Sequence, residues 1–179
     1  AIAVTNSGQP IYNIQDTAVW TASDGTASAY HYNRVETETS PFALGNTDSS
    51  GIQYYTTLNA DVVGSTAWGN ATTHSGIVGW AFDGLPIYGP YGYNDPLDPT
   101  SGIDRMLTSW RIKNRRDSDG PDVATYPLGS FIADYYYQHR FGSLDENNGR
   151  YCVTPDYPNG VYAYFITVSA GNTPVFPYI

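Results

Sequence analysis

The strongest constraint on how this chain can fold is a run of twenty residues, 74–93, with five glycines, two prolines and five aromatic residues. So much glycine disfavours a helix and would weaken the interior of an ordinary strand. The run instead predicts a hairpin-like element. We expect an apolar strand over 77–82 that is buried on both faces, a turn at 83–84, a second extended segment at 87–88 and another turn at 89–92.

A compact hairpin accounts for the glycines and prolines of this run, but it gives no reason for His74 and Asp83. Glycines let two backbones approach each other closely, and prolines stiffen the chain beside a turn. We therefore expect the element to hold His74 and Asp83 near a common site.

Alternating apolar and polar residues predict further strands along the chain. They are expected over residues 1–5, 17–22, 28–33, 52–58 and 161–169. The segments between them are rich in Gly, Asn, Asp, Ser and Pro, which is typical of turns.

Two segments could be helical. In 103–113, four apolar residues follow a helical spacing, whereas 128–139 is ambiguous because its three consecutive tyrosines favour a strand. The sequence as a whole predicts a mainly β fold with long loops and one or two short helices. We expect residues 1–179 to form a single compact domain.

Charge and composition exclude several classes of partner. Seventeen acidic and eight basic residues give a net charge of −9, which argues against binding nucleic acid. Half of the basic residues lie within 111–116, but aspartates follow at once within 117–122, so we expect a salt-bridged surface turn rather than a phosphate-binding patch. No apolar run approaches the length of a membrane span, and a single cysteine excludes an internal disulfide.

The three histidines, His31, His74 and His139, each lie in an aromatic, turn-rich segment. In an extended strand, His31 and Asn33 would share one face, so that both could point at one ion or ligand. Three convergent imidazoles would suit zinc or copper. The alternative is that each imidazole is partly buried and hydrogen-bonded without an ion.

Neighbouring carboxylates could complete such a metal site, and Asp83, Asp134 and Asp145 are the candidates. A second hypothesis places calcium in the loop 144–151, where Asp145, Asn147 and Gly149 alternate as in the first half of a calcium-binding loop. The segment 116–122 offers aspartates in a similar way. Neither loop has the terminal glutamate of an EF-hand, and aspartate-rich turns without ions are common.

The case for catalysis from sequence is weak. The chain has no GxSxG, P-loop, HExxH or CxxC motif. Cys152 is a nucleophile in principle, but a lone cysteine entering a turn from a strand is more often a small buried apolar residue.

With AYHYN at 29–33, the run at 74–93, the segment 144–169 and the closing TPVFPYI in view, the chain resembles the YHYH domain family. The opening VTNSGQPIYN resembles a typical segment of the same family. The resemblance covers most of the chain in the expected order. It implies a domain of secreted, extracellular or phage structural proteins, and no particular reaction.

Two positions depart from the family pattern. The naming motif reads Tyr30-His31-Tyr32-Asn33, so its second histidine is replaced by asparagine. Family members commonly have a cysteine at the position of Asn147, where it would pair with Cys152 in a disulfide clip. Here Cys152 stands alone, and Asn147 gives the calcium-like pattern.

Three functions remain open at this stage. The favoured one is a structural or adhesive module of an extracellular or virion-surface assembly, as a homo-oligomer or with an assembly partner, with a loop-stabilising metal ion. Richness in Tyr, Gly and Asn with a single lysine is typical of such surfaces. The alternatives are a copper or zinc enzyme that uses the three histidines, and a carbohydrate-binding module with a glycan on Trp20, Trp68 or Trp110.

Overall fold

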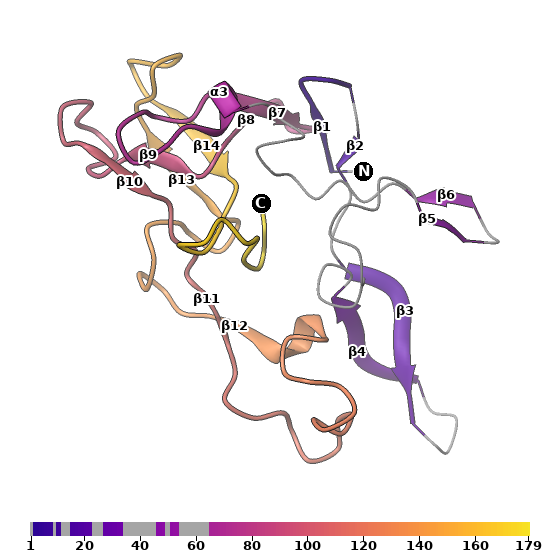
Figure 1. The fold of residues 1–179 in the computed structure, drawn as a ribbon. Helices are drawn as coiled ribbons and strands as arrows, with labels where there is room; N and C mark the ends of the chain where they lie inside the picture. Colours follow the sequence, from indigo (N-terminus) through magenta and orange to yellow (C-terminus); the bar gives the residue numbers. More distant parts are fainter. Residues whose placement is uncertain are drawn as a thin grey trace.

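The computed structural model describes residues 2–8, 10–11, 15–22, 27–33, 46–48, 51–53 and 65–179. Within these ranges the helical segments are α3 (Ser65–Trp68) and the 3-10 turn η1 (Ile132–Asp134), and all other regular structure is β. The described residues form one compact domain with open sheets (Figure 1). This confirms the expected mainly β fold with short helices. No helix in these ranges is long and apolar enough to cross a membrane.

A six-stranded sheet forms the larger part of the domain. Its strands lie in the order β13 (Gly149–Cys152), β14 (Val161–Phe165), β8 (Pro86–Tyr88), β7 (Ile77–Ala81), β1 (Ala3–Thr5) and β2 (Pro10–Ile11). The pair β14 and β8 is parallel, and every other neighbouring pair is antiparallel.

The run 74–93 folds largely as its composition predicts. Strands β7 and β8 form a hairpin around a turn in which Gly84 has a φ of +87°. Gly79 lies in β7 where a side chain would meet the backbone oxygen of Val4 at 2.6 Å, so glycine lets β1 approach this closely.

Two details of the prediction for this run are wrong. The strand buried on both faces is β8, whereas β7 exposes Trp80 because β1 covers only its backbone edge. The second half of the turn predicted at 89–92 is instead part of β9 (Tyr91–Tyr93), which pairs with β10 (Ile103–Arg105).

The hydrophobic core lies on both faces of the six-stranded sheet. Adjacent residues of β8, Ile87 and Tyr88, belong to two different clusters, as expected for successive side chains of a strand. The first cluster contains Ala3, Ile11, Trp68, Val78, Ile87, Ile166 and Val168. The second contains Tyr88, Met106, Leu144, Cys152, Ala163 and Phe165.

The predicted helix over 103–113 is wrong. Its ends form β10 and β11 (Trp110–Ile112), and β11 pairs with β12 (Tyr135–Tyr137). The backbone between them bonds to distant segments: Met106 N–H donates to Pro90 O at 2.8 Å, and Leu107 O accepts from Ser143 N–H at 2.9 Å. Tertiary pairing therefore replaces the local helical bonds. The ambiguous segment 128–139 contains both alternatives, η1 followed by β12.

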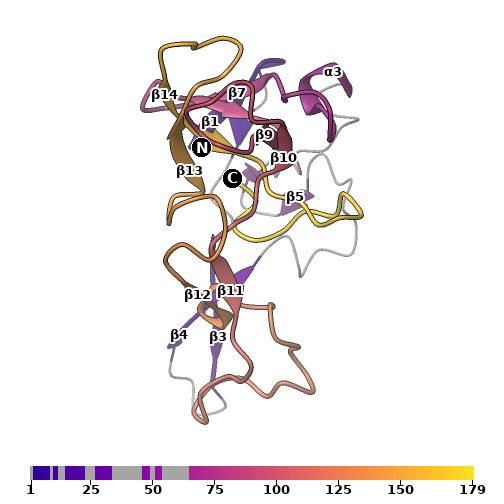
Figure 2. The ribbon, with the colours of Figure 1, turned by 90° about the vertical axis from the view of Figure 1, so that its left-hand side faces the viewer.

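Strands β3 (Gln15–Thr21) and β4 (Ala27–Asn33) pair with each other and confirm the strands predicted at 17–22 and 28–33. They lie beside β12 and η1, away from the six-stranded sheet (Figures 1 and 2). The rings of Tyr30 and Tyr32 pack on Phe131, with ring centroids 5.6 and 4.9 Å apart.

Strands β1 and β14 are shorter than predicted. β1 lies within 1–5, β14 occupies the first half of 161–169, and β5 (Asn46–Asp48) pairs with β6 (Gly51–Gln53). The predicted strand 52–58 overlaps β6 at its start, and residues 54–58 lie outside the described residues.

Candidate binding site

A hollow of about 470 Å³ lies beside the turn between β7 and β8. Three polar side chains line it: Asp83 from the turn, Asn147 from the loop before β13, and Tyr164 from β14. The remaining walls are apolar and include Ile2, Ala3, Ala81, Phe82, Ile87 and Ile179. The volume falls within the range of small-ligand sites.

The carboxylate of Asp83 is fixed by two donors. The hydroxyl of Tyr164 donates to Oδ2 at 2.6 Å, and the backbone N–H of Leu85 donates to Oδ1 at 3.0 Å. Burial, together with the neighbouring Asp83, raises the pKa of Tyr164 to about 12. Tyr164 therefore remains a protonated hydrogen-bond donor at neutral pH.

Asp145 lies next to this hollow, and its carboxylate accepts hydrogen bonds from the backbone of its own loop, which precedes β13. Its Oδ1 accepts from the backbone N–H groups of Asn147 at 2.9 Å and Gly149 at 3.1 Å, and its Oδ2 accepts from Tyr162 at 2.8 Å. The rings of Tyr162 and Tyr164 meet edge to face at 5.4 Å. The sequence pattern that resembles a calcium loop is therefore a turn stabilised by its aspartate, in which a cation would compete with three donors.

His74 lies on the other side of β8, within the core. Its Nδ1 is 2.6 Å from the carbonyl oxygen of Ser75, which can only accept, so Nδ1 carries the proton. Nε2 is buried and has no hydrogen-bond partner among the described residues. Burial lowers the pKa of His74, the Ser75 carbonyl opposes this shift, and the positive charge of Arg150 adds to it. A metal ion at Nε2 would lie close to that same guanidinium.

The remaining predicted ligands lie elsewhere. His31 is half-buried in β4 opposite Val19, and His139 is exposed after β12, with its Nδ1 3.4 Å from the hydroxyl of Tyr137. Asn33 is fully buried, and its amide donates to Gly129 O at 3.2 Å.

The structure therefore brings together Asp83, Asp145 and Asn147, whereas His31 lies in β4, His74 before β7 and His139 after β12. Across residues 2–8, 10–11, 15–22, 27–33, 46–48, 51–53 and 65–179, no three His, Cys, Asp or Glu side chains form a group that could hold a metal ion.

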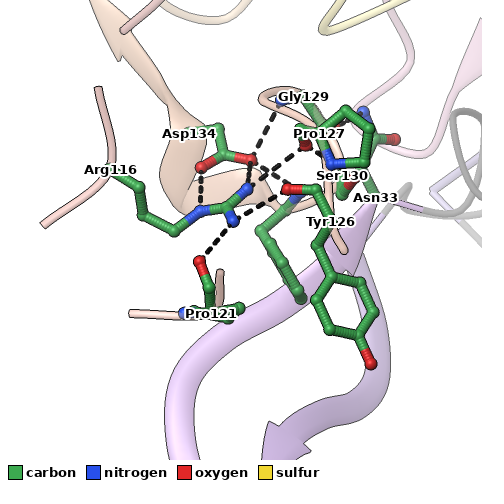
Figure 3. A network of polar contacts seen from close by, with 9 residues as sticks. Asn33, Arg116, Pro121, Tyr126, Pro127, Gly129, Ser130 and Asp134 are labelled. Carbon is green, nitrogen blue, oxygen red and sulfur yellow. Dashed lines mark hydrogen bonds and ion pairs between the residues drawn. The ribbon is translucent and has the colours of Figure 1, made fainter. Parts of the chain in front are cut away.

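A buried ion pair that the sequence did not reveal joins Arg116 to Asp134. Arg116 Nε and Nη2 donate to the two oxygens of Asp134 at 2.8 and 2.7 Å, and both side chains are almost completely buried (Figure 3). The guanidinium also donates to the carbonyls of Pro121, Tyr126 and Pro127. The expected pairing of the basic cluster with the aspartates at 117–122 is wrong for Arg116, because its partner is eighteen positions away.

Cys152, the nucleophile that the sequence offers in principle, is poorly placed for nucleophilic chemistry. Cys152 is fully buried, and burial raises the pKa of its thiol even though Arg150 lies nearby. Of the tryptophans considered as sugar platforms, Trp68 is in the core and Trp110 is half-buried against Phe176. What the hollow near Asp83 offers is a shaped apolar surface with fixed polar groups at its edge.

Comparison with known proteins gives a family. A family model described as YHYH protein matches residues 1–176. No curated protein and no solved structure matches the chain. The match covers nearly the whole chain, including the strand with Tyr30-His31-Tyr32-Asn33 and the run 74–93. The chain therefore belongs to the YHYH protein family.

Proposed function

We propose that the chain is a non-enzymatic structural or adhesive module that packs against a second copy of itself in an extracellular or virion-surface assembly. The observation that carries this proposal is a group of three exposed apolar side chains. Ile2 and Phe82 line the hollow beside the β7–β8 turn, and Trp80 lies on β7. The exposed fractions of Ile2, Trp80 and Phe82 are 46%, 36% and 68%. Soluble monomers rarely leave large apolar side chains together in water.

The register of the sheet places these three side chains close together. Trp80 lies directly opposite Val4, and the backbone N–H of Phe82 donates to Ile2 O at 3.0 Å, so the pairing continues to the ends of β1 and β7. Side chains directly opposite across two strands share one face. Aromatic side chains beside an apolar hollow are the kind of residue that dominates binding energy at protein interfaces.

The placement of the polar groups supports a binding role rather than a catalytic one. The carboxylates of Asp83 and Asp145 accept from internal donors, and the three histidines belong to different parts of the domain. Cys152 is buried in the core.

Self-association of the purified chain tests the proposal. Sedimentation velocity over a rising concentration series should show a concentration-dependent shift from monomer to a larger species. Phe82→Ser should weaken association by at least about 30-fold, the effect of losing an interface residue worth about 2 kcal/mol.

Leu97→Ser is the matched control, since Leu97 is 64% exposed but does not line the hollow. It should leave association unchanged. A strictly monomeric wild-type particle, or equal effects of the two substitutions, would contradict the proposal.

A further inference from the structure

A second hollow, of about 450 Å³, has the opposite chemical character to the first. It lies along β11 and the residues that follow it. Three basic side chains, Arg111, Lys113 and Arg115, line it together with one acidic residue, Asp117. This concentrates positive charge in a chain whose net charge is −9.

The basic side chains of this hollow are not neutralised by ion pairs. Among the described residues, Arg116 is paired with Asp134, whereas Arg111, Lys113 and Arg115 have no carboxylate within salt-bridge distance. Arg111 instead lies over the ring of Phe141, with its guanidinium carbon 4.0 Å from the ring centroid. That contact holds the charge in place while leaving it without an anion.

The backbone under the hollow is held firmly. Arg111 lies directly opposite Tyr136 in the pairing of β11 with β12, and Lys113 N–H continues the ladder by donating to Asp134 O at 2.8 Å. The buried Arg116–Asp134 pair anchors the chain immediately after the hollow. A site whose groups are fixed before binding loses less entropy when a ligand arrives.

The hollow also has a neutral wall that suits a sugar. Tyr136 is 41% exposed and offers a flat ring with a hydroxyl at its tip, and Asn114 supplies an amide. Aromatic faces with polar tips suit ligands that are partly apolar and partly hydroxylated. Arginine forks match the geometry of carboxylate and sulfate oxygens.

We propose that this basic hollow binds an acidic carbohydrate, an oligosaccharide carrying carboxylate or sulfate groups, with Arg111, Lys113 and Arg115 on the anionic group and Tyr136 beside the sugar ring. A nucleic acid fits the hollow less well. Nucleic-acid binding rests on several phosphate contacts along a basic stripe. The net charge of −9 on the chain opposes such a highly charged polymer.

Titration calorimetry at low salt tests this, with a heparin-derived tetrasaccharide as the sulfated probe, tetragalacturonate as the carboxylated probe and maltotetraose as the neutral one. We expect the chain to bind at least one acidic probe, to bind the neutral probe at least about tenfold more weakly, and to lose affinity at high salt. Which acidic probe binds more tightly distinguishes sulfate from carboxylate as the recognised group.

The double variant Lys113→Gln, Arg115→Gln should weaken binding of the acidic probe by at least about tenfold. Asp117→Asn is the matched variant in the same hollow, and it should tighten binding because it removes the one negative charge there. Unchanged melting curves would establish that each variant is folded.

Three results would overturn the proposal. One is equal binding of the neutral and acidic probes. Another is binding of free sulfate or acetate as tightly as the oligosaccharides, which would indicate an adventitious ion only. The third is a double variant that leaves oligosaccharide binding intact but changes the sedimentation of the protein alone, which would make the hollow a contact for the acidic surface of a second copy.

Discussion

At the scale of single residues, His74 shows how the core fixes a protonation state. Its Nδ1 proton is directed at the Ser75 carbonyl, and the rings of Tyr93 and Tyr88 pack at centroid distances of 4.8 and 5.4 Å. Two charged groups influence the pKa of His74. Arg150 lowers it, whereas Asp156 raises it by less than burial lowers it. Burial in the folded state therefore lowers the pKa of His74 and favours its neutral form.

The stability of the chain should consequently fall when the pH is lowered from about 7 to about 5. The pKa of His74 is near 6.5 in the unfolded chain and lower in the folded one, so the unfolded state takes up a proton first. The contribution of neutral His74 to the free energy of unfolding is complete above the pKa that His74 has in the unfolded chain. It is lost as the pH falls toward the pKa in the folded chain. The slope is at most about 1.4 kcal/mol per pH unit for one proton. Urea unfolding at a series of pH values measures it.

His74→Phe keeps an aromatic ring between Tyr88 and Tyr93 and removes the titratable imidazole. The free energy of unfolding of this variant should therefore change less between about pH 7 and about pH 5. His139→Gln is the control because His139 is exposed, and its profile should follow the wild type. A His74→Phe profile as steep as the wild-type one would show that another group is responsible.

At the scale of elements, β4 is joined to the segment 126–134 by buried polar groups. Asn33 N–H donates to Ser130 O at 2.8 Å, and the Asn33 amide donates to Gly129 O and to the hydroxyl of Tyr178. Asp134 Oδ2 accepts from the backbone N–H of Gly129 and of Phe131 at 3.0 and 3.1 Å. The asparagine that replaces the second histidine of the family motif is thus a structural link in this chain.

Asp134→Asn should destabilise the fold by about 3–5 kcal/mol, since it leaves the Arg116 guanidinium buried without a counter-charge. Equilibrium unfolding in guanidinium chloride measures the change. Asp117→Asn, on the exposed side of the same segment, should stay within about 0.5 kcal/mol of the wild type. A loss below about 1 kcal/mol for Asp134→Asn would mean that the guanidinium is well solvated.

The elements that were predicted correctly are those in which the local sequence pattern agrees with the contacts that the element makes in the fold. The glycines at 79 and 84 mark a close approach and a positive φ, and the alternation at 28–33 matches a strand that packs Tyr30 and Tyr32 on Phe131. The helix predicted over 103–113 is wrong although Met106 and Leu107 both fit a helical stripe. In the structure Met106 is buried and Leu107 is exposed. Their environments are set by β9 and by residues 142–144, which no local pattern reveals.

At the scale of the whole molecule, the candidate ligands are distributed over the domain rather than gathered. Sequence spacing indicated that Asp145 and Asn147 lie together, and the fold adds Asp83 through Tyr164. Sequence spacing could not indicate that His31 lies in β4 while His74 packs on Tyr88 in the core of the six-stranded sheet. Nor could it pair Arg116 with Asp134, because that contact depends on how two loops meet.

This distribution leads to a prediction about metal removal. An ion present at a free concentration of about a hundred times its dissociation constant would stabilise the fold by about 2.7 kcal/mol. In a chain of this size, that corresponds to a change in melting temperature of several degrees. Because the carboxylate of Asp145 already accepts from Asn147, Gly149 and Tyr162, we expect EDTA to leave the melting temperature of the chain unchanged. Calorimetry with and without EDTA, then with added calcium, zinc or copper, measures this. A drop of several degrees that calcium restores, and that Asp145→Asn abolishes, would show that an ion displaces these donors and that the loop before β13 is a calcium site after all.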